Sequence, residues 1–355
     1  MKIAKANHKK WALLIGCLLL AASGWSQGWE AAFGGNKLDE GKAVVVTQDG
    51  GYVLAGFSES FGEDNDLDAY IVRADIDGNI IWEHVYDEGY RELTYSIVEA
   101  DAGSFLVVGE IQTVVDGEKN VYLLKVSKEG KQLWSRQYGG PMSDQGFDLA
   151  RTRDGGYIIV GTTKNTDNGE DNILLIRIDE QGEELWSKQY GDEDDDQGRA
   201  VVVLDDGFAF VGNSDNPNGF DKDIVLYKVD TEGRTIWTRR IATLENEEGN
   251  DLVASRNGDI SITGLINDNS DAFIARFDSD GDQKWMRAFG GPLGDAAKSI
   301  IELPNGDLVV VGFTELNEVN VNILLAKLSA AGEIIWINDL GEPSEKFEMG
   351  EGIAA

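Results

Sequence analysis

The chain has 355 residues and a formal net charge of −33, with 31 Lys and Arg against 64 Asp and Glu. So large an excess of negative charge makes nucleic acid and anionic membrane surfaces poor partners, and it suits cations, basic surfaces or simple solvation. With one cysteine and two histidines, zinc sites, Cys–His pairs and most Ser–His triads are excluded. Any chemistry must therefore come from carboxylates, and no residue is marked as catalytic.

The first 26 residues have the pattern of a signal peptide. A basic stretch, MKIAKANHKK, precedes the apolar run WALLIGCLLLAA and the small residues of SGWSQ. The apolar run is too short to span a membrane, and cleavage before Gln27 would leave a mature chain at 27–355 without cysteine. The alternative is a bacterial lipoprotein box at 14–17, which would anchor the chain through Cys17. Both interpretations predict a secreted or outer-surface bacterial protein with no membrane span in its mature part.

A tryptophan returns about every fifty residues after this segment, and a period of that length predicts repeated supersecondary units. A tryptophan held at one repeat position after a hairpin glycine is expected to wedge between adjacent units as a structural docking residue, rather than to stack on a sugar. They are Trp29, Trp82, Trp134, Trp186, Trp237, Trp285 and Trp336.

Each unit contains four short apolar runs, which in the first unit are 43–47, 52–57, 69–74 and 80–86. The runs are rich in Val, Ile, Leu, Tyr and Trp and bounded by Gly, Asp and Asn, which is typical of strands. No later segment has a sustained helical period. Four strands per unit at this repeat length predict an all-β fold, a β-propeller of four-stranded blades.

Glycines recur at fixed positions in the units. Asx-Gly pairs such as Asp154-Gly155 supply the positive φ of tight hairpins between the first two strands. A second glycine lies four residues before each tryptophan in the complete units, as Gly130 does before Trp134. A third lies within the second strand, as Gly161 does, where a side chain would collide with a neighbouring backbone.

The strand count predicts six complete blades and a split, incomplete seventh. The blades are expected at about 43–87, 94–139, 147–190, 198–242, 249–289 and 297–340, with closing strands at 29–34 and 350–355. The seventh blade lacks its two middle strands, so we expect about 35 further residues after Ala355 from the repeat period. A closed six-bladed ring with two frayed ends is the alternative.

One acidic position recurs before the first strand of every unit. If that strand is innermost, these side chains encircle the axis at the mouth of the channel. They can cap backbone N–H groups of the preceding connection, or form a ring of negative charge that concentrates cations or a basic ligand. The positions are Asp39, Glu92, Asp144, Asp196, Glu247, Asp295 and, in the partial repeat, Glu348.

The long connections between blades and strands are rich in Asp and Asn. In the first of them Asp64, Asp66 and Asp68 place carboxylates at alternate positions, which suits Ca²⁺ because this ion takes six to eight oxygen ligands. No segment matches the twelve-residue EF-hand loop. We therefore predict a calcium site at these three residues, and calcium is the one cofactor that the residue types suggest.

The segment 125–135, KVSKEGKQLWS, resembles the tryptophan-docking repeat of quinoprotein (PQQ-dependent) dehydrogenase propellers and their non-catalytic relatives. The resemblance implies that each tryptophan docks one blade on the next. The DGGY segments at 49–52 and 154–157 are also similar to those of secreted or surface-attached bacterial propellers. Those quinone enzymes typically carry an adjacent cysteine pair over the cofactor, which this chain lacks, so PQQ is not expected.

These observations together predict a binding or scaffold propeller that recognises an extracellular protein or glycan through an acidic loop face, with Ca²⁺, as a monomer. The alternative is a carboxylate-based glycoside hydrolase or lyase. A deep apolar pocket holding two acids on that face would favour the enzyme, and a flat acidic face would favour binding.

Overall fold

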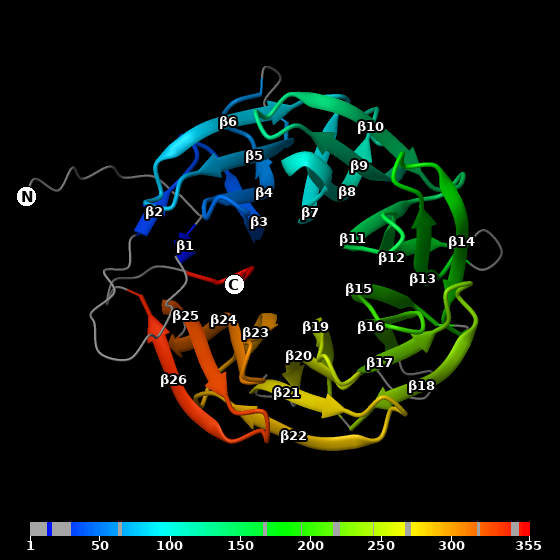
Figure 1. The fold of residues 1–355 in the computed structure, drawn as a ribbon, viewed down its shortest axis with the longest axis vertical. Helices are drawn as coiled ribbons and strands as arrows, with labels where there is room; N and C mark the ends of the chain where they lie inside the picture. The colour runs from blue at the N-terminus through cyan, green and yellow to red at the C-terminus, as the bar shows by residue number, and fades with distance from the viewer. Residues whose placement is uncertain are drawn as a thin grey trace, which may run out of the picture.

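The structure is a computed structural model that describes residues 13–15, 30–62, 66–165, 169–192, 194–215, 221–243, 245–266, 271–317, 320–341 and 348–355. Six four-stranded antiparallel sheets are arranged around a central axis (Figure 1), which confirms the predicted all-β propeller with six complete blades. Each sheet uses four consecutive strands, called A to D from the axis outward.

The blades have the following strands. Blade 1 is β3 (Asp39–Val46), β4 (Tyr52–Ser58), β5 (Asp68–Ala74) and β6 (Ile80–Tyr86); blade 2 is β7 (Arg91–Glu99), β8 (Phe105–Gln112), β9 (Lys119–Val126) and β10 (Gln132–Tyr138); blade 3 is β11 (Asp144–Arg151), β12 (Tyr157–Lys164), β13 (Asp171–Ile178) and β14 (Glu184–Tyr190). Blade 4 is β15 (Asp196–Val203), β16 (Phe208–Asp215), β17 (Lys222–Val229) and β18 (Thr235–Ile241); blade 5 is β19 (Glu248–Ala254), β20 (Ile260–Ile266), β21 (Asp271–Phe277) and β22 (Gln283–Phe289); blade 6 is β23 (Asp295–Glu302), β24 (Leu308–Asn317), β25 (Asn320–Leu328) and β26 (Ile334–Leu340).

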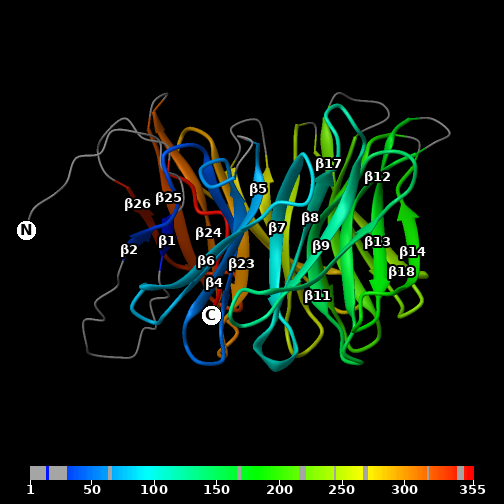
Figure 2. The same ribbon diagram turned by 90° about the horizontal axis from the view of Figure 1, so that it is seen from above.

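The strands run between two faces of the ring, where the connections gather (Figure 2). We call the face with the D-to-A and B-to-C connections the loop face, and the face with the A-to-B and C-to-D turns the hairpin face. The hydrophobic core lies between neighbouring blades. Strands B and C are covered on both sides, so their apolar runs are continuous, and residues 157–160 of β12 are fully buried.

Strand A has a bulge near its start in every blade, as between Gly146 and Asp148 in β11. The bulge brings a strand-A carbonyl over the strand-B glycine. A Cβ atom on Gly161 would lie 1.8 Å from the carbonyl oxygen of Gln145, and one on Gly109 would lie 1.8 Å from that of Leu93. The predicted collision with backbone is therefore confirmed.

The predicted starts of strand A were wrong. In four blades the strand begins at the acidic residue itself, Asp39, Asp144, Asp196 or Asp295, two to four residues earlier than the blade bounds expected from the sequence. The bulge shifts the register after the first few residues, so the apolar alternation that marks the strand is visible only beyond it.

The indoles of blades 1 to 5 lie against the hairpin of the following blade. Trp82 Nε1 donates to the carbonyl of Lys128 at 2.9 Å, and Trp237 Nε1 donates to that of Ser279 at 3.2 Å. The tyrosine four residues on reinforces the contact in three blades: Tyr86 Oη donates to the carbonyl of Gly130 at 2.6 Å, and Tyr138 and Tyr190 do the same one and two blades on. Trp29 lies outside the described residues.

The seventh sector contains parts of both ends of the chain. The strand β2 (Glu30–Ala32) pairs antiparallel with β1 (Leu13–Ile15), which belongs to the segment predicted as a signal peptide. Near the axis, Gly350 N donates to the carbonyl of Gly312 at 3.0 Å. Gly350 packs against Val311 and Ile323 in the way that strand-A glycines of other blades pack on the preceding blade. The segment 350–355 occupies the place of a strand A (Figure 1), although it forms no sheet.

Candidate functional site

Most of the recurring acidic residues are buried and serve the connection that precedes them. In five of them, the carboxylate accepts a hydrogen bond from the backbone N–H four residues earlier. The donors and distances are Gly35 to Asp39 (2.8 Å), Gly140 to Asp144 (2.7 Å), Asp192 to Asp196 (2.8 Å), Thr243 to Glu247 (3.1 Å) and Gly291 to Asp295 (2.7 Å). Burial raises the pKa of Asp144, Asp196, Glu247 and Asp295.

The residue that follows strand D explains why the D-to-A connections look alike. Gly191 follows strand D with a φ of 136°, and a Cβ atom there would lie 2.2 Å from the carboxylate of Asp196. A side chain at this position would therefore push the capping carboxylate away. Because these carboxylates are buried and face their own connections, they do not form an open ring of charge at the mouth of the channel, as one interpretation of the sequence had it.

Glu92 departs from this pattern. Its side chain is 0% exposed, and neither carboxylate oxygen has a hydrogen bond of normal geometry within the described part of the chain. Instead it meets Asp68, at the start of β5, and Asp87, directly after β6, and one carboxylate oxygen from each of the three lies within 4.8 Å of the others. Burial, followed by the charges of Asp68 and Asp87, raises the pKa of Glu92 to about 8, and a weaker hydrogen-bonding contribution from the backbone of Glu88 lowers it.

The backbone around this cluster is closely fitted to it. Glu92 N donates to the carbonyl of Leu67 at 2.7 Å, which joins strand A of blade 2 to the B-to-C connection of blade 1. A Cβ atom on Gly62 would lie 2.0 Å from Asp68 Oδ2, and one on Gly89 would lie 2.8 Å from Glu92 Oε1. Only glycine leaves room for the carboxylates at these two positions.

The predicted calcium residues are partly brought together. Asp64 lies outside the described residues, while Asp66 has a buried Oδ1 without a hydrogen-bond partner in the described chain, and Asp68 belongs to the cluster. Sequence reasoning missed Asp87. A signal was present, because the residue that follows strand D is glycine or alanine in the other five blades (139, 191, 242, 290 and 341) and an acid only here.

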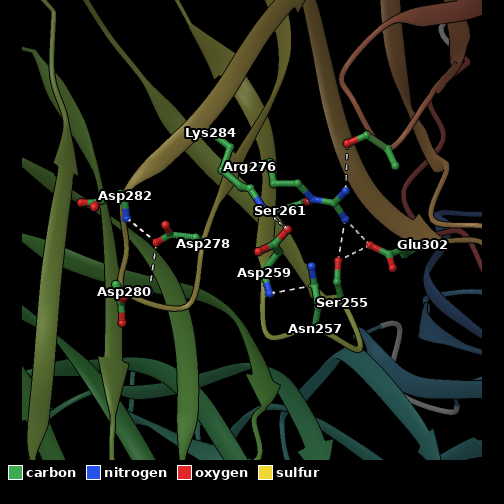
Figure 3. A network of polar contacts seen from close by, with 11 residues as sticks. Ser255, Asn257, Asp259, Ser261, Arg276, Asp278, Asp280, Asp282, Lys284 and Glu302 are labelled. Atoms are coloured by element: carbon green, nitrogen blue, oxygen red, sulfur yellow. Dashed lines mark hydrogen bonds and ion pairs between the residues drawn. The ribbon is translucent and has the colours of Figure 1, made fainter.

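The hairpin face has a different polar arrangement. A basic residue of strand C pairs with an acid of its own A-to-B turn in several blades, as Arg177 does with Asp154 at 2.5 Å. In blade 5 the turn has Asn257 instead, and Arg276 reaches across to Glu302 of blade 6 (Figure 3). Arg276 also donates to Ser255 Oγ at 2.5 Å and to Ser261 Oγ at 3.0 Å. Ser255, Asn257, Arg276 and Glu302 line a groove of about 490 Å³ between blades 5 and 6.

Two aspartates near the axis join the innermost strands of neighbouring blades. Asp148 accepts hydrogen bonds from Ser96 Oγ of blade 2 at 2.7 Å and from Val201 N of blade 4 at 2.9 Å. Asp251 accepts from Ser299 Oγ and Ile300 N of blade 6, both at 2.9 Å. Burial raises the pKa of Asp148 to about 6, and burial with the charge of Asp148 raises that of Asp251 to about 7.

From the raised pKa values of Asp148 and Asp251 we expect the stability of the fold to depend on pH. Because the folded pKa values exceed the unfolded value of about 3.9, the folded state binds more protons between about pH 4 and 7, so the free energy of unfolding falls as pH rises through this window. We expect the double variant Asp148→Asn/Asp251→Asn to show a shallower fall in melting temperature between pH 5 and 8 than the parent. Parallel curves for the two proteins would contradict the assignment.

Comparison with known proteins shows the family. Residues 170–352, slightly more than half of the chain, match the family described as outer membrane protein assembly factor BamB. The chain belongs to this family. It is also similar to the regulatory protein FlaEY of Caulobacter vibrioides, with 25% identity over 220 residues. That match covers 52% of this chain and only 23% of FlaEY, so the chain spans about a quarter of that relative's length.

One solved structure with a TM-score above 0.5 shares the fold of this family member. A protein of unknown function from Bacteroides caccae has a TM-score of 0.52 and 11% identity, and the alignment covers 80% of this chain and 94% of that one. A second, from Dyadobacter fermentans, has a TM-score of 0.49 and 10% identity, with 83% and 92% covered. At such identities the likeness concerns the fold alone. Within the described residues, no helix is long and apolar enough to cross a membrane.

Proposed function

We propose that this family member is a binding or scaffold propeller at the bacterial cell surface. Its loop face recognises a basic segment of a partner protein. The observation that carries the proposal is the crowding of carboxylates on that face. The pKa of Glu170 is raised by a hydrogen bond with Asp195 and by the charge of that neighbour, and the charge of Asp195, after burial, also raises the pKa of Asp171. Like charges that raise one another's pKa create a negative potential that attracts cationic groups.

The comparisons support a protein partner. The family is described by a role in outer membrane protein assembly, which concerns other proteins rather than small substrates, and FlaEY is described as a regulatory protein. An acidic surface also favours a basic protein segment over a neutral or acidic glycan, because complementary charge guides association. A secreted or outer-surface location agrees with the basic and apolar N-terminal segment.

The test measures binding of a fluorescent lysine-rich peptide by anisotropy, in buffer with EGTA and at two salt concentrations. The variant Glu118→Gln/Asp192→Asn/Asp194→Asn removes three carboxylates from the loop face. We expect roughly tenfold weaker binding for this variant, and weaker binding of the parent at high salt.

The matched control is Asp77→Asn/Glu180→Gln/Asp280→Asn, which removes the same charge from three C-to-D turns of the hairpin face. It is expected to bind the peptide like the parent. An equal loss in both variants would show an effect of net charge alone, and retention in the loop-face variant would place recognition elsewhere. Either result would overturn the proposal, and stronger binding of a neutral glycan than of the peptide would favour the glycan class.

A further inference from the structure

We propose that blades 1 and 2 are joined by one calcium ion bound to Asp68, Asp87 and Glu92. The site lies at the loop face, where strand C of blade 1, the D-to-A connection and strand A of blade 2 come together. It does not depend on the partner proposed above, because the ion would be bound by the free propeller.

The spacing of the three carboxylates suits an ion of this size. Calcium binds oxygen at 2.3–2.6 Å, so two oxygens that share one ion lie at most about twice that distance apart. One oxygen from each of Asp68, Asp87 and Glu92 lies within 4.8 Å of the other two, which meets this condition without rearrangement of the backbone.

Glu92 gives the second, independent indication of a ligand. The same position in blades 1, 3, 4, 5 and 6 receives an N–H of normal geometry from its own connection. The fully buried carboxylate of Glu92 has no such bond in the described chain and faces Asp68 and Asp87, whose charges affect its pKa more than the backbone of Glu88 does. No Lys or Arg of that part of the chain forms an ion pair with Glu92. A buried carboxylate in this state requires a proton or a cation.

The chemistry of the donors selects among cations. All three side chains offer hard carboxylate oxygens, and none of the three is histidine or cysteine, which disfavours zinc and the softer transition metals. Asp68 and Glu92 are buried while Asp87 is exposed, so the ion can enter from solvent and keep water ligands on that side. Calcium tolerates such an irregular, mixed shell, whereas magnesium demands near-octahedral geometry. Asp66 Oδ1 is buried without a hydrogen-bond partner in the described chain. It lies 3.7 Å from the Cβ position of Gly62, and Asp68 Oδ2 lies 2.0 Å from the same point, so Asp66 is placed to add a fourth protein ligand.

The departure from the repeat supports a dedicated site. An acid follows strand D only in blade 1, and elsewhere this position is glycine or alanine. Blade 5 also has acids at the other two positions, Asp271 and Asp295, but Gly290 stands where blade 1 has Asp87, and Asp295 caps Gly291 N at 2.7 Å. The third carboxylate is therefore what distinguishes the proposed site from a structural cap.

The experiment uses the full chain, freed of metal with EGTA and then titrated with CaCl₂ by calorimetry and thermal unfolding. We expect a single binding event and a rise in melting temperature of roughly 5 °C at a hundredfold excess over Kd. Glu92→Gln and Asp87→Asn should lose the calcium response. Without calcium, both variants should melt at or above the temperature of the parent, because each removes repulsion among like charges.

The control variant is Asp144→Asn, which changes the equivalent acidic position of blade 3. It should melt at a lower temperature, because Asp144 caps its connection, and it should keep the full calcium response. The proposal is wrong if the parent neither binds calcium nor gains stability from it, or if Glu92→Gln still responds like the parent. A Glu92→Gln variant that is less stable than the parent in EGTA, with a parent indifferent to calcium, would make Glu92 a purely structural residue.

Discussion

Gly161→Ala is expected to lower the free energy of unfolding by about 3 kcal/mol, the upper end of the range for overpacking in a well-packed interior. The added Cβ would lie 1.8 Å from the carbonyl oxygen of Gln145 and 3.0 Å from the Cα of Gly146. These are backbone atoms of the bulged strand A and cannot rotate away, so the sheet must open at β11 and β12. Chemical denaturation followed by tryptophan fluorescence measures the loss.

Gly140→Ala is the control for this prediction. A Cβ at Gly140 meets no atom within 4 Å, and its N–H can still cap Asp144. We expect a change of less than about 0.5 kcal/mol, as for ordinary surface substitutions. If the two alanine variants are equally stable, the close approach of strand A to strand B is not what requires glycine at position 161.

Arg276→Met is expected to cost about 3–4 kcal/mol, because it leaves Glu302 without its partner in a partly buried place. The guanidinium of Arg276, in a residue 5% exposed, joins the A-to-B turn of blade 5 to β23 and to the carbonyl of Ala330 in blade 6 (Figure 3). Methionine keeps most of the apolar stem but removes every donor. Differential scanning calorimetry should show a lower melting temperature with the fold retained.

Two further variants separate the buried pair from a general charge effect. Arg276→Met/Glu302→Leu removes both charges and should recover much of the lost stability. Arg153→Met breaks an ion pair with Asp205 in which both side chains are more than half exposed, so it should cost less than about 1 kcal/mol. A loss at Arg153 as large as that at Arg276 would contradict the argument from burial.

The repeat made the architecture predictable. Gly130 and Trp134 mark the C-to-D hairpin, and Gly161 marks the close approach within the sheet. At each of these places one structural requirement is met by one type of residue, so the residue type reveals the structure. The start of strand A was not predictable in the same way. A bulge is a matter of register between two strands, and residues 144–146 have no apolar alternation from which to infer it.

The site was predictable only in part for a related reason. The acidic position was evident from its recurrence, but whether Asp144 or Glu92 caps a connection depends on the direction of the side chain, which the sequence does not contain. Asp68, Asp87 and Glu92 lie on three elements of two blades, and only the packing of those blades brings them together. The presence of Asp87 where the other units have glycine or alanine was the one visible sign.

The contact of each indole with the next hairpin has a consequence for how this architecture can vary. All six C-to-D turns have five residues, at 75–79, 127–131, 179–183, 230–234, 278–282 and 329–333, whereas the B-to-C connections range from two residues at 318–319 to nine at 59–67. A longer C-to-D turn would displace the carbonyls that accept from Trp82 and Trp237, so we expect insertions in the B-to-C connections on the opposite rim. New specificities can therefore be grafted onto that rim while the joints between neighbouring sheets stay unchanged.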